Sequence, residues 1–358
     1  MAERDPLSAS TAGARLTVDP AAVVRNWQHL AAMTGGRCGA VVKANAYGHG
    51  AETVCPALAK AGCDTFFVAL EAEGVDLRAA VPGATIYVLN GIFGTPDSAR
   101  RHQLRPFISS LDALAEWPDD LPFALNIDTG MNRLGVSVSQ ALARAATAPA
   151  PALIASHFAC ADTPDHTLND AQSAAFATVR RAFPAVPASL SNSAALLTRS
   201  DAHYDLARPG IALYGGAPVD GIAPLEPTVR LEARIIQVRT AEAGETVGYG
   251  AAQTLKQRAE IAIVSLGYAD GFLRAAGGSD VAAGAPAAFG GAPTRLIGRV
   301  SMDLIAVDVT GLGARRGDFI ELLGPDVPLE TVARHAGTIG YELLTGLSRR
   351  AERVHGPL

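Results

Sequence analysis

The sequence predicts an α/β fold in which an N-terminal (β/α)8 barrel of the TIM type is followed by a C-terminal, mainly β domain. Over about the first 220 residues, short apolar runs alternate with amphipathic stretches, as expected for a barrel of the usual ~250 residues. After about Pro227 the chain changes to short β-branched segments separated by turn residues, which indicates sheet. With 358 residues, 49% hydrophobic and 18% charged, the chain is long enough to bury two cores.

The barrel prediction rests on eight strand candidates and the helical stretches between them. The strand candidates are 38–43, 66–70, 85–89, 104–108, 123–127, 153–157, 188–191 and 205–208. Helical periodicity occurs in 20–33, 51–61, 71–79, 96–102, 110–115, 137–146 and 169–182. Asp19 is suited to cap the first helix and Pro20 to open it. A doubly wound open sheet is the alternative, but no GxGxxG turn follows the first strand.

Five further strand candidates predict the C-terminal domain, at 228–240, 259–266, 294–300, 304–309 and 317–323. The small residues of 276–292 are expected to form an exposed, mobile loop. We therefore expect a barrel over 14–227 and a β domain over 228–358. Residues 1–13 are expected either to pack against the β domain or to be disordered.

Composition and charge exclude several classes of function. The net charge of -5 offers no general surface for nucleic acid, and no apolar run approaches the ~20 residues of a membrane span. The N-terminus lacks a secretory pattern, so we expect a cytoplasmic protein. The four cysteines show no CxxC spacing, which favours buried thiols over a metal site or disulfides.

Lysine is rare in this chain, which makes one lysine conspicuous. Of the 30 basic residues only Lys43, Lys60 and Lys256 are lysines, leaving 27 arginines. Lys43 ends the first strand candidate, and the working groups of an α/β barrel lie at the carboxyl ends of its strands. Any single such residue could simply be a polar residue that ends a strand. Several of them on one face favour a site: Asn126, Ser156 and His157, Asn192 and Ser193, and Arg208.

A lysine in such a site is partly desolvated, which lowers its pKa and frees the neutral amine. A neutral amine forms Schiff bases with aldehydes. The aldehyde would be pyridoxal 5′-phosphate if a phosphate-binding site lies nearby, and barrels often build one after strands seven and eight. Candidates there are the hydroxyl of Ser193 and the amides of Gly210 and Ile211, with the Tyr47 hydroxyl close to Lys43 in sequence.

Eight motifs of the chain resemble those of alanine racemases and occur in the same order. They are AVVKANAYGHG (40–50), NIDTGMNRLG (126–135), SHFACAD (156–162), SNSAA (191–195), ARPGIALYG (207–215), VGYG (247–250), GYADG (267–271) and GRVSMD (298–303). The resemblance covers roughly residues 14–350. It implies a pyridoxal-phosphate barrel with a C-terminal β domain, alanine as substrate, and an obligate head-to-tail homodimer.

By matched motif, Lys43 resembles the lysine that binds the cofactor covalently and moves a proton on one face of the substrate Cα. Tyr249 resembles the opposing tyrosine, which the other subunit donates. Inversion needs a proton removed from one face and one returned to the other. Because both groups have ordinary pKa values near ~10, both must be tuned toward the working pH.

Two more matches concern the cofactor ring. Arg208 resembles the arginine that faces the pyridine nitrogen; since it stays protonated, it would leave that nitrogen unprotonated and weaken the electron sink. A short-lived carbanion then favours reprotonation over transamination. His157 resembles the histidine that hydrogen-bonds this arginine, linking it toward the tyrosine. Arg133 resembles the arginine that contacts the phenolic oxygen of the cofactor and helps to hold the substrate carboxylate.

The remaining matches implied by the resemblance line the substrate entrance and the phosphate site. Met302 resembles the residue whose backbone amide, from the partner chain, contacts the substrate carboxylate. Tyr268 and Asp303 resemble residues at the entrance. The phosphate ligands would be Tyr47, Ser193, Gly210 and Ile211, with Asn192 adjoining.

At two positions this chain departs from the family pattern. Where many members carry a carbamylated lysine, it has Asn126, whose neutral amide leaves Arg133 in need of another anion; we expect chloride or another small anion there. Where some members have a tyrosine that reaches the phosphate, it has Arg349, which could bind phosphate or point to solvent. That position borders the substrate pocket, so it bears on substrate range.

The sequence therefore predicts an alanine racemase that supplies D-alanine for peptidoglycan. A broader-specificity racemase acting on serine or other small amino acids is the nearest alternative. A decarboxylase would need an acidic partner for the pyridine nitrogen, which Arg208 opposes. A non-catalytic pyridoxal-phosphate carrier would have no need of Tyr249, Met302 and Asp303.

Overall fold

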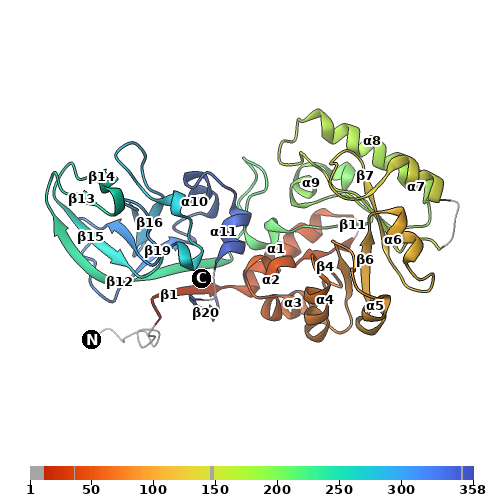
Figure 1. Ribbon diagram of the computed structural model, residues 1–358, viewed down its shortest axis with the longest axis horizontal. Coiled ribbons are helices and arrows are strands. Elements are labelled where there is room, and N and C mark those ends of the chain that lie inside the picture. Colours follow the sequence, from red (N-terminus) through yellow and green to blue (C-terminus); the bar gives the residue numbers. More distant parts are fainter. Residues whose placement is uncertain (1–11, 36, 146–148, 348–349) are drawn as a thin grey trace. The chain divides into compact units, whose positions relative to one another are not determined.

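The computed structural model describes residues 12–35, 37–145, 149–347 and 350–358. Its chain divides into two compact units, one within residues 20–226 and one that joins residues 12–19 to the described part of 227–358; the expectation for residues 1–11 lies outside the described residues. We call the first the barrel unit and the second the β unit, and we describe each by itself (Figure 1).

The barrel unit is built on a curled parallel sheet with the order β10-β9-β7-β6-β5-β4-β3. Its strands are β3 (Ala40–Val41), β4 (Thr65–Val68), β5 (Thr85–Val88), β6 (Leu104–Ile108), β7 (Ala124–Asp128), β9 (Leu153–Ala155) and β10 (Ala188–Ser189), and the short β8 (Val136–Ser137) pairs with β7. Each paired register is parallel. Parallel strands in sequence order, with helices between them, confirm the predicted TIM-like architecture.

A second pairing closes this sheet into a barrel. β2 (Arg37–Cys38) pairs in parallel with β11 (Leu206–Ala207), and the amide of Val41 donates to the carbonyl oxygen of Pro209 at 3.0 Å. On the other side of β11, the Arg208 amide donates to the Ser191 carbonyl oxygen, also at 3.0 Å. The first and last strands of the barrel are therefore neighbours.

Helices lie around the sheet of the barrel unit (Figure 1). They are α1 (Pro20–Met33), α3 (Ala51–Lys60), α4 (Glu71–Ala80), α5 (Pro96–His102), α6 (Leu111–Glu116), α7 (Val138–Arg144), α8 (Thr167–Ala182) and α9 (Ser193–Thr198). Pro20 opens α1, as predicted. In α8, Phe176 and Val179 are fully buried, and they join Leu125 of β7 in one apolar cluster.

The expected first strand, 38–43, is shorter in the structure. It ends at Val41, and Lys43 instead begins α2 (Lys43–Tyr47), which is not an ordinary helix because Ala44, Asn45 and Ala46 have φ between 52 and 55°. Left-handed turns of ordinary residues are rare, and sequence periodicity carries no signal for one. The Gly-rich end of the motif, Gly48 to Gly50, completes the turn.

The β unit is organised around one long strand, β12 (Val229–Ala241), which pairs with β1 (Ala14–Val18), β15 (Ala259–Val264) and β19 (Phe319–Leu323). The other elements are β13 (Thr246–Val247), β14 (Gln253–Thr254), β16 (Pro286–Phe289), β17 (Ala292–Arg295), β18 (Ile305–Asp308), β20 (Glu352–His355), α10 (Leu329–His335) and α11 (Gly340–Gly346). The mainly β character predicted after residue 228 is confirmed.

The structure corrects two predictions about this unit. β1 lies in its sheet between β12 and β20, so residues 14–19 do not belong to the barrel. Its partners lie more than 200 residues away, where local patterns cannot reveal them. Residues 286–289, expected within a mobile loop, form β16, whose Ala287 and Ala288 are buried. The strand forms because β17 and β19 flank it, although alanine has a low strand propensity.

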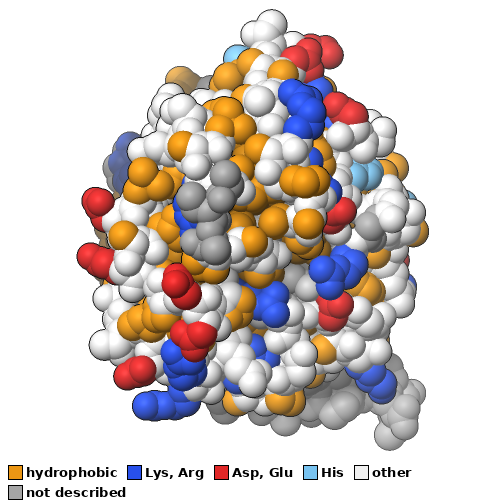
Figure 2. All heavy atoms as spheres, turned by 90° about the vertical axis from the view of Figure 1, so that its right-hand side faces the viewer, with side chains coloured by type: hydrophobic (Ala, Val, Ile, Leu, Met, Phe, Trp, Pro, Cys, Tyr) orange, Lys and Arg blue, Asp and Glu red, His pale blue; other side chains and the backbone are white. Residues whose placement is uncertain are grey.

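Basic and acidic side chains are interspersed on the face of the barrel unit that carries α6 and α7 (Figure 2). No helix in the described ranges is both long and apolar enough to cross a membrane.

Truncation of a buried side chain in the barrel should destabilise it far more than the same truncation at the surface. Leu125 is 1% exposed in the apolar cluster, whereas Leu142 of α7 is 38% exposed. We expect Leu125→Ala to lower the free energy of unfolding by about 2–5 kcal/mol and Leu142→Ala by less than about 1 kcal/mol. Urea unfolding followed by circular dichroism measures both, and equal losses would contradict this packing.

Candidate active site

Lys43 lies at the carboxyl end of β3, where the left-handed turn begins. Four consecutive residues, Ala44 to Tyr47, have positive φ, and each costs about 1–2 kcal/mol relative to the right-handed form. Hydrogen bonds within the motif hold the turn: the Gly48 amide donates to the Ala44 carbonyl oxygen at 2.9 Å, and the Ala51 amide to Asn45 Oδ1 at 2.8 Å. Lys43 is therefore presented on a rigid segment.

Two effects lower the pKa of Lys43. Burial is the larger, and the positive charge of Arg133 adds to it, while the negative charge of Glu73 acts in the opposite direction. The predicted desolvation of this lysine is thus present in the structure. More of the amine is neutral near pH 7 than in an ordinary lysine.

Arg208 is a buried cation that follows β11, only 6% exposed. Its Nη2 donates to the Ser156 carbonyl oxygen at 2.6 Å, and its Nη1 donates to the Ser189 hydroxyl. Ser189 in turn donates to the Leu206 carbonyl oxygen at 2.5 Å, so its lone pairs are turned to the guanidinium. Burial lowers the pKa of Arg208 to about 10, which still leaves the side chain charged at neutral pH.

His157 lies beside Arg208, as the sequence predicted. Arg208 Nη2 and His157 Nδ1 are 3.5 Å apart, and because an arginine can only donate, Nδ1 must be the acceptor. Burial and the positive charges of Arg208, Arg133 and Lys43 lower the pKa of His157 to about 3. The ring is therefore neutral, with its proton on Nε2.

Hydroxyl and amide groups gather where β11 ends. Ser193 Oγ accepts from the amides of Gly210 at 2.8 Å and Ala212 at 3.3 Å. A Cβ at Gly210 would lie 2.5 Å from the Tyr47 hydroxyl oxygen, so only glycine allows this approach. Ile211, which opens the next turn, is buried, and Asn192 caps α9 by accepting from the Ala195 amide at 3.0 Å. The residues expected to bind phosphate are thus brought together.

Arg133 and Asn126 come from β7 and the loop after it. The Arg133 side chain is exposed, and within the described ranges it makes no hydrogen bond or ion pair, although its charge acts on Lys43 and His157. Asn126 uses its amide nitrogen to donate to Ser109 Oγ at 3.1 Å.

The other predicted site residues belong to the β unit and lie on neighbouring loops. Tyr249, in VGYG, is 73% exposed, and the preceding Val247 packs against Gly298. The amide of Tyr268 donates to the Ser301 carbonyl oxygen at 3.0 Å, so GYADG lies against the loop that holds Met302. Met302 is 54% exposed. The three C-terminal motifs therefore form one group within the β unit.

Asp303 is held by an arginine that the sequence reasoning missed. Arg350 Nη2 donates to Asp303 Oδ1 at 2.8 Å, and Arg350 Nε lies 3.3 Å from Asp270 Oδ1. The expectation for the neighbouring Arg349 lies outside the described residues. Two adjacent arginines look alike in a sequence, and only the structure shows that Arg350 contacts Asp303.

Gln172 of α8 is a second missed residue. It is fully buried, donates to the His157 carbonyl oxygen at 2.9 Å and to Thr129 Oγ1 at 3.1 Å, and accepts from the Ala159 amide at 2.9 Å. Thr129 Oγ1 lies 2.8 Å from Ser156 Oγ. Gln172 thus fixes the strand end that carries His157. In the sequence, Gln172 shares the apolar face of the helix with Phe176 and Val179, and a polar residue on that face could have indicated a buried hydrogen-bonding role.

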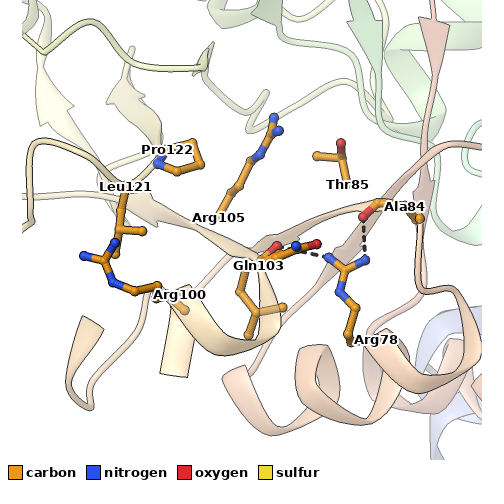
Figure 3. Close-up of a pocket in the computed structure, with 11 residues that line it drawn as sticks. Arg78, Ala84, Thr85, Arg100, Gln103, Arg105, Leu121 and Pro122 are labelled. Atoms are coloured by element: carbon orange, nitrogen blue, oxygen red, sulfur yellow. Dashed lines mark hydrogen bonds between the residues drawn. The ribbon is translucent and has the colours of Figure 1, made fainter. Parts of the chain in front are cut away.

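A pocket of about 340 Å³ lies at the opposite, amino ends of β5 and β6 (Figure 3). Three arginines line it, and each of them already binds other groups of the barrel unit. Arg78 donates at 2.7–3.2 Å to the carbonyl oxygens of Val81, Ala84, His102 and Gln103. Arg100 is bound to Asp120, and Arg105 lies over the Tyr87 ring, 5.7 Å from its centroid. We assign this pocket a structural role.

The fold and the site define an α/β barrel that carries a pKa-lowered lysine and a buried arginine at one end. Two family models match the chain, the N-terminal domain of alanine racemase over residues 18–218 and its C-terminal domain over 228–355. A biosynthetic alanine racemase of Agrobacterium fabrum is 46% identical, with 95% of this chain and 93% of that protein covered. A catabolic alanine racemase of Mesorhizobium japonicum is 42% identical, with 97% and 94% covered.

Solved structures agree with these relatives. The biosynthetic alanine racemase of Pseudomonas aeruginosa has a TM-score of 0.90 and 38% identity, covering 97% of this chain and 100% of that one. The alanine racemase of Bartonella henselae, with covalently bound pyridoxal phosphate, has a TM-score of 0.88 and 36% identity, covering 96% and 99%. The chain belongs to the alanine racemase family, whose named members are isomerases.

The depressed pKa of His157 predicts an acid-sensitive site. The ordinary pKa of a histidine is 6.5, and in the folded chain the pKa of His157 is about 3. Between these two pH values His157 is protonated in the unfolded chain but not in the folded chain. The free energy of unfolding therefore falls as the pH falls through this window. We expect the wild type to lose more stability between about pH 7 and about pH 5 than His157→Asn does.

Urea unfolding at both pH values measures this difference. Substitution of an exposed histidine, His29→Asn, is the control and should keep the wild-type pH dependence. If His157→Asn loses as much stability as the wild type, His157 is not the group responsible.

Proposed function

We propose that this protein interconverts L-alanine and D-alanine with pyridoxal 5′-phosphate, and that it supplies D-alanine for peptidoglycan synthesis. The observation that carries the proposal is the site around Lys43, a pKa-lowered lysine whose charge acts on His157 together with those of Arg208 and Arg133. Membership of the alanine racemase family supports the same reaction.

The residues present fit this cofactor. Lys43 can hold its aldehyde carbon, and the hydroxyls of Tyr47 and Ser193 with the amides of Gly210 and Ile211 are suitable phosphate ligands. Asn192 supports them as the cap of α9. Arg208 would donate to the ring nitrogen and Arg133 to the phenolic oxygen. When bound, the cofactor draws electrons from the substrate and makes the Cα proton acidic.

Inversion at Cα then requires a proton-transfer group on each face. Lys43, with its lowered pKa, is proposed to serve one face, and the phenol of Tyr249 the other. Tyr249 and Met302 are largely exposed in the chain, which supports their contribution to the site of a partner subunit in a homodimer. The Met302 amide would hold the substrate carboxylate together with Arg133, while Tyr268 and Asp303 would line the entrance.

Arg208 and His157 are proposed to control the protonation of the cofactor's ring nitrogen. Arg208 remains charged because its pKa is lowered only to about 10, so it would leave the ring nitrogen unprotonated and limit side reactions such as transamination. The neutral His157 accepts from Arg208, and its Nε2–H is proposed to bond toward Tyr249 of the partner subunit.

Replacement of the proposed second proton-transfer group should separate turnover from binding. We expect Tyr249→Phe to lower kcat for L-alanine racemisation by roughly 10²- to 10⁴-fold, the usual size of a lost acid or base, while the cofactor absorbance persists. Circular dichroism of the alanine solution follows the reaction. Tyr341→Phe, on α11, is the control.

Unchanged racemisation by Tyr249→Phe would contradict the two-group mechanism. A wild type that binds the cofactor but racemises nothing would instead support a carrier protein. Serine racemised as fast as alanine would identify the broader-specificity enzyme, so the assay includes a panel of L-amino acids.

A small anion, such as chloride, is proposed to lie between Asn126 and Arg133. The support is that Arg133 has no carboxylate partner among the described residues, and that the neutral amide of Asn126 cannot supply the missing charge. An anion there would orient Arg133 toward the cofactor and the substrate carboxylate.

Halide dependence tests this site. Adding chloride should lower KM for alanine about fivefold, which corresponds to ~1 kcal/mol for a charge pair at the surface. Asn126→Asp supplies the charge itself and should abolish the dependence, whereas Asn132→Asp in the same loop should retain it. Bromide crystals with no anomalous peak at Asn126, and activity indifferent to halide, would refute the proposal.

A cytoplasmic location is part of the proposed function. It is supported by the four cysteines, which are all free and mostly buried, as suits a reducing compartment.

A further inference from the structure

We propose that Glu73, outside every motif of the family resemblance, is the positioning residue that holds Lys43 in its working orientation. The inference deepens the proposed function, because it rests on Lys43 as the proton-transfer amine. Glu73 lies in the first turn of α4, the helix that follows β4.

The carboxylate of Glu73 ties two strand ends together. Its Oε1 accepts from the amide of Ala44, the residue after Lys43, at 2.6 Å. Its Oε2 accepts from the amides of Ala69 at 2.8 Å and Leu70 at 3.0 Å. Bonds from amides to an ionised carboxylate are stronger than neutral ones. The backbone next to Lys43 is thereby attached to the end of β4.

This attachment is needed because the backbone after Lys43 is unfavourable. Ala44 has φ 52° and ψ 47° and begins the run of four left-handed residues. Its amide lies at the start of that run, and Glu73 Oε1 is the acceptor that satisfies it. Without this acceptor the turn could relax toward right-handed φ, and Lys43 would rotate with it.

The position of Glu73 is itself built into the packing of α4. A Cβ on the next residue, Gly74, would lie 3.1 Å from Leu104 Cδ2, so the helix approaches β6 closely at this point. A cap for α4 alone would need only the bonds to Ala69 and Leu70. The bond to Ala44 has no role in that cap, which points to Lys43.

The charge of Glu73 also matters to the amine. The titratable groups that act electrostatically with Lys43 are Arg133, His157 and Glu73. Glu73 is the acidic member of this set, and it raises the pKa of Lys43 while burial and Arg133 lower it. Glu73→Gln should therefore lower the pKa of Lys43 as well as loosen the turn.

The test compares Glu73→Gln with Glu71→Gln in the cofactor-loaded full chain. Glu71 lies in the same first turn of α4, so its substitution removes an equal charge without touching Ala44. We expect Glu73→Gln to lower kcat roughly ten- to a hundredfold with little change in KM, and to move the pH profile of kcat to lower pH. Hydrogen–deuterium exchange of the 43–47 segment should accelerate. Glu71→Gln should match the wild type in each measurement.

A third variant separates positioning from general instability. Glycine adopts positive φ readily, so Ala44→Gly combined with Glu73→Gln should recover part of the lost kcat and of the lost protection. Equal behaviour of Glu73→Gln and Glu71→Gln, or no recovery in the double variant, overturns the inference. If exchange responds as expected but the wild type racemises no amino acid, the positioning contact stands and the proposed function fails.

Discussion

The pairing of β2 with β11 is the constraint on which the barrel unit depends, because it brings the two ends of that unit's sequence to one rim. Arg37 and Cys38 lie beside Leu206 and Ala207. Five residues after Cys38 comes Lys43, and one residue after Ala207 comes Arg208. Closure thus brings the lysine segment and the buried arginine to the same end of the barrel, which neither segment could achieve locally.

Once closed, this end of the barrel concentrates positive charge in a partly desolvated place. Burial, and then the charges of Arg208, Arg133 and Lys43, lower the pKa of His157, so the histidine is neutral at neutral pH. Backbone and hydroxyl oxygens solvate Arg208, while Arg133 has no acidic partner among the described residues. Such an arrangement is costly without anions, and it suits a ligand that carries phosphate and carboxylate groups.

The left-handed turn fixes the position of the Lys43 backbone at this end of the barrel. Four residues with positive φ store strain beside Lys43, and strain of this kind persists only where its surroundings over-determine the conformation. The hydrogen bonds that Glu73 and Asn45 accept, and those that the following glycines donate, hold the four residues in this conformation. Rigidity of the lysine segment is thus shared among residues of α2, α3 and α4.

Local patterns were sufficient to predict most elements of this protein. The helices at 20–33 and 96–102 have the predicted bounds, and the strand at 104–108 does too, since the residue pattern that specifies each is encoded nearby. Residue chemistry also singled out Lys43, because arginine can neither form a Schiff base nor release a proton near neutral pH.

Tertiary structure alone decided the rest. Residues 14–18 joined the β unit because their partners lie far away in sequence. Residues 286–289 became a strand by pairing with 292–295 across Gly290 and Gly291 and with the distant β19. The contacts of Glu73, Gln172 and Arg350 with the site residues likewise depend on folded geometry. The sequence by itself determined which groups can do the chemistry, since reactivity belongs to residue type. Only the fold decided which of them meet and which conformations they hold, because distances and desolvation arise from packing between remote segments.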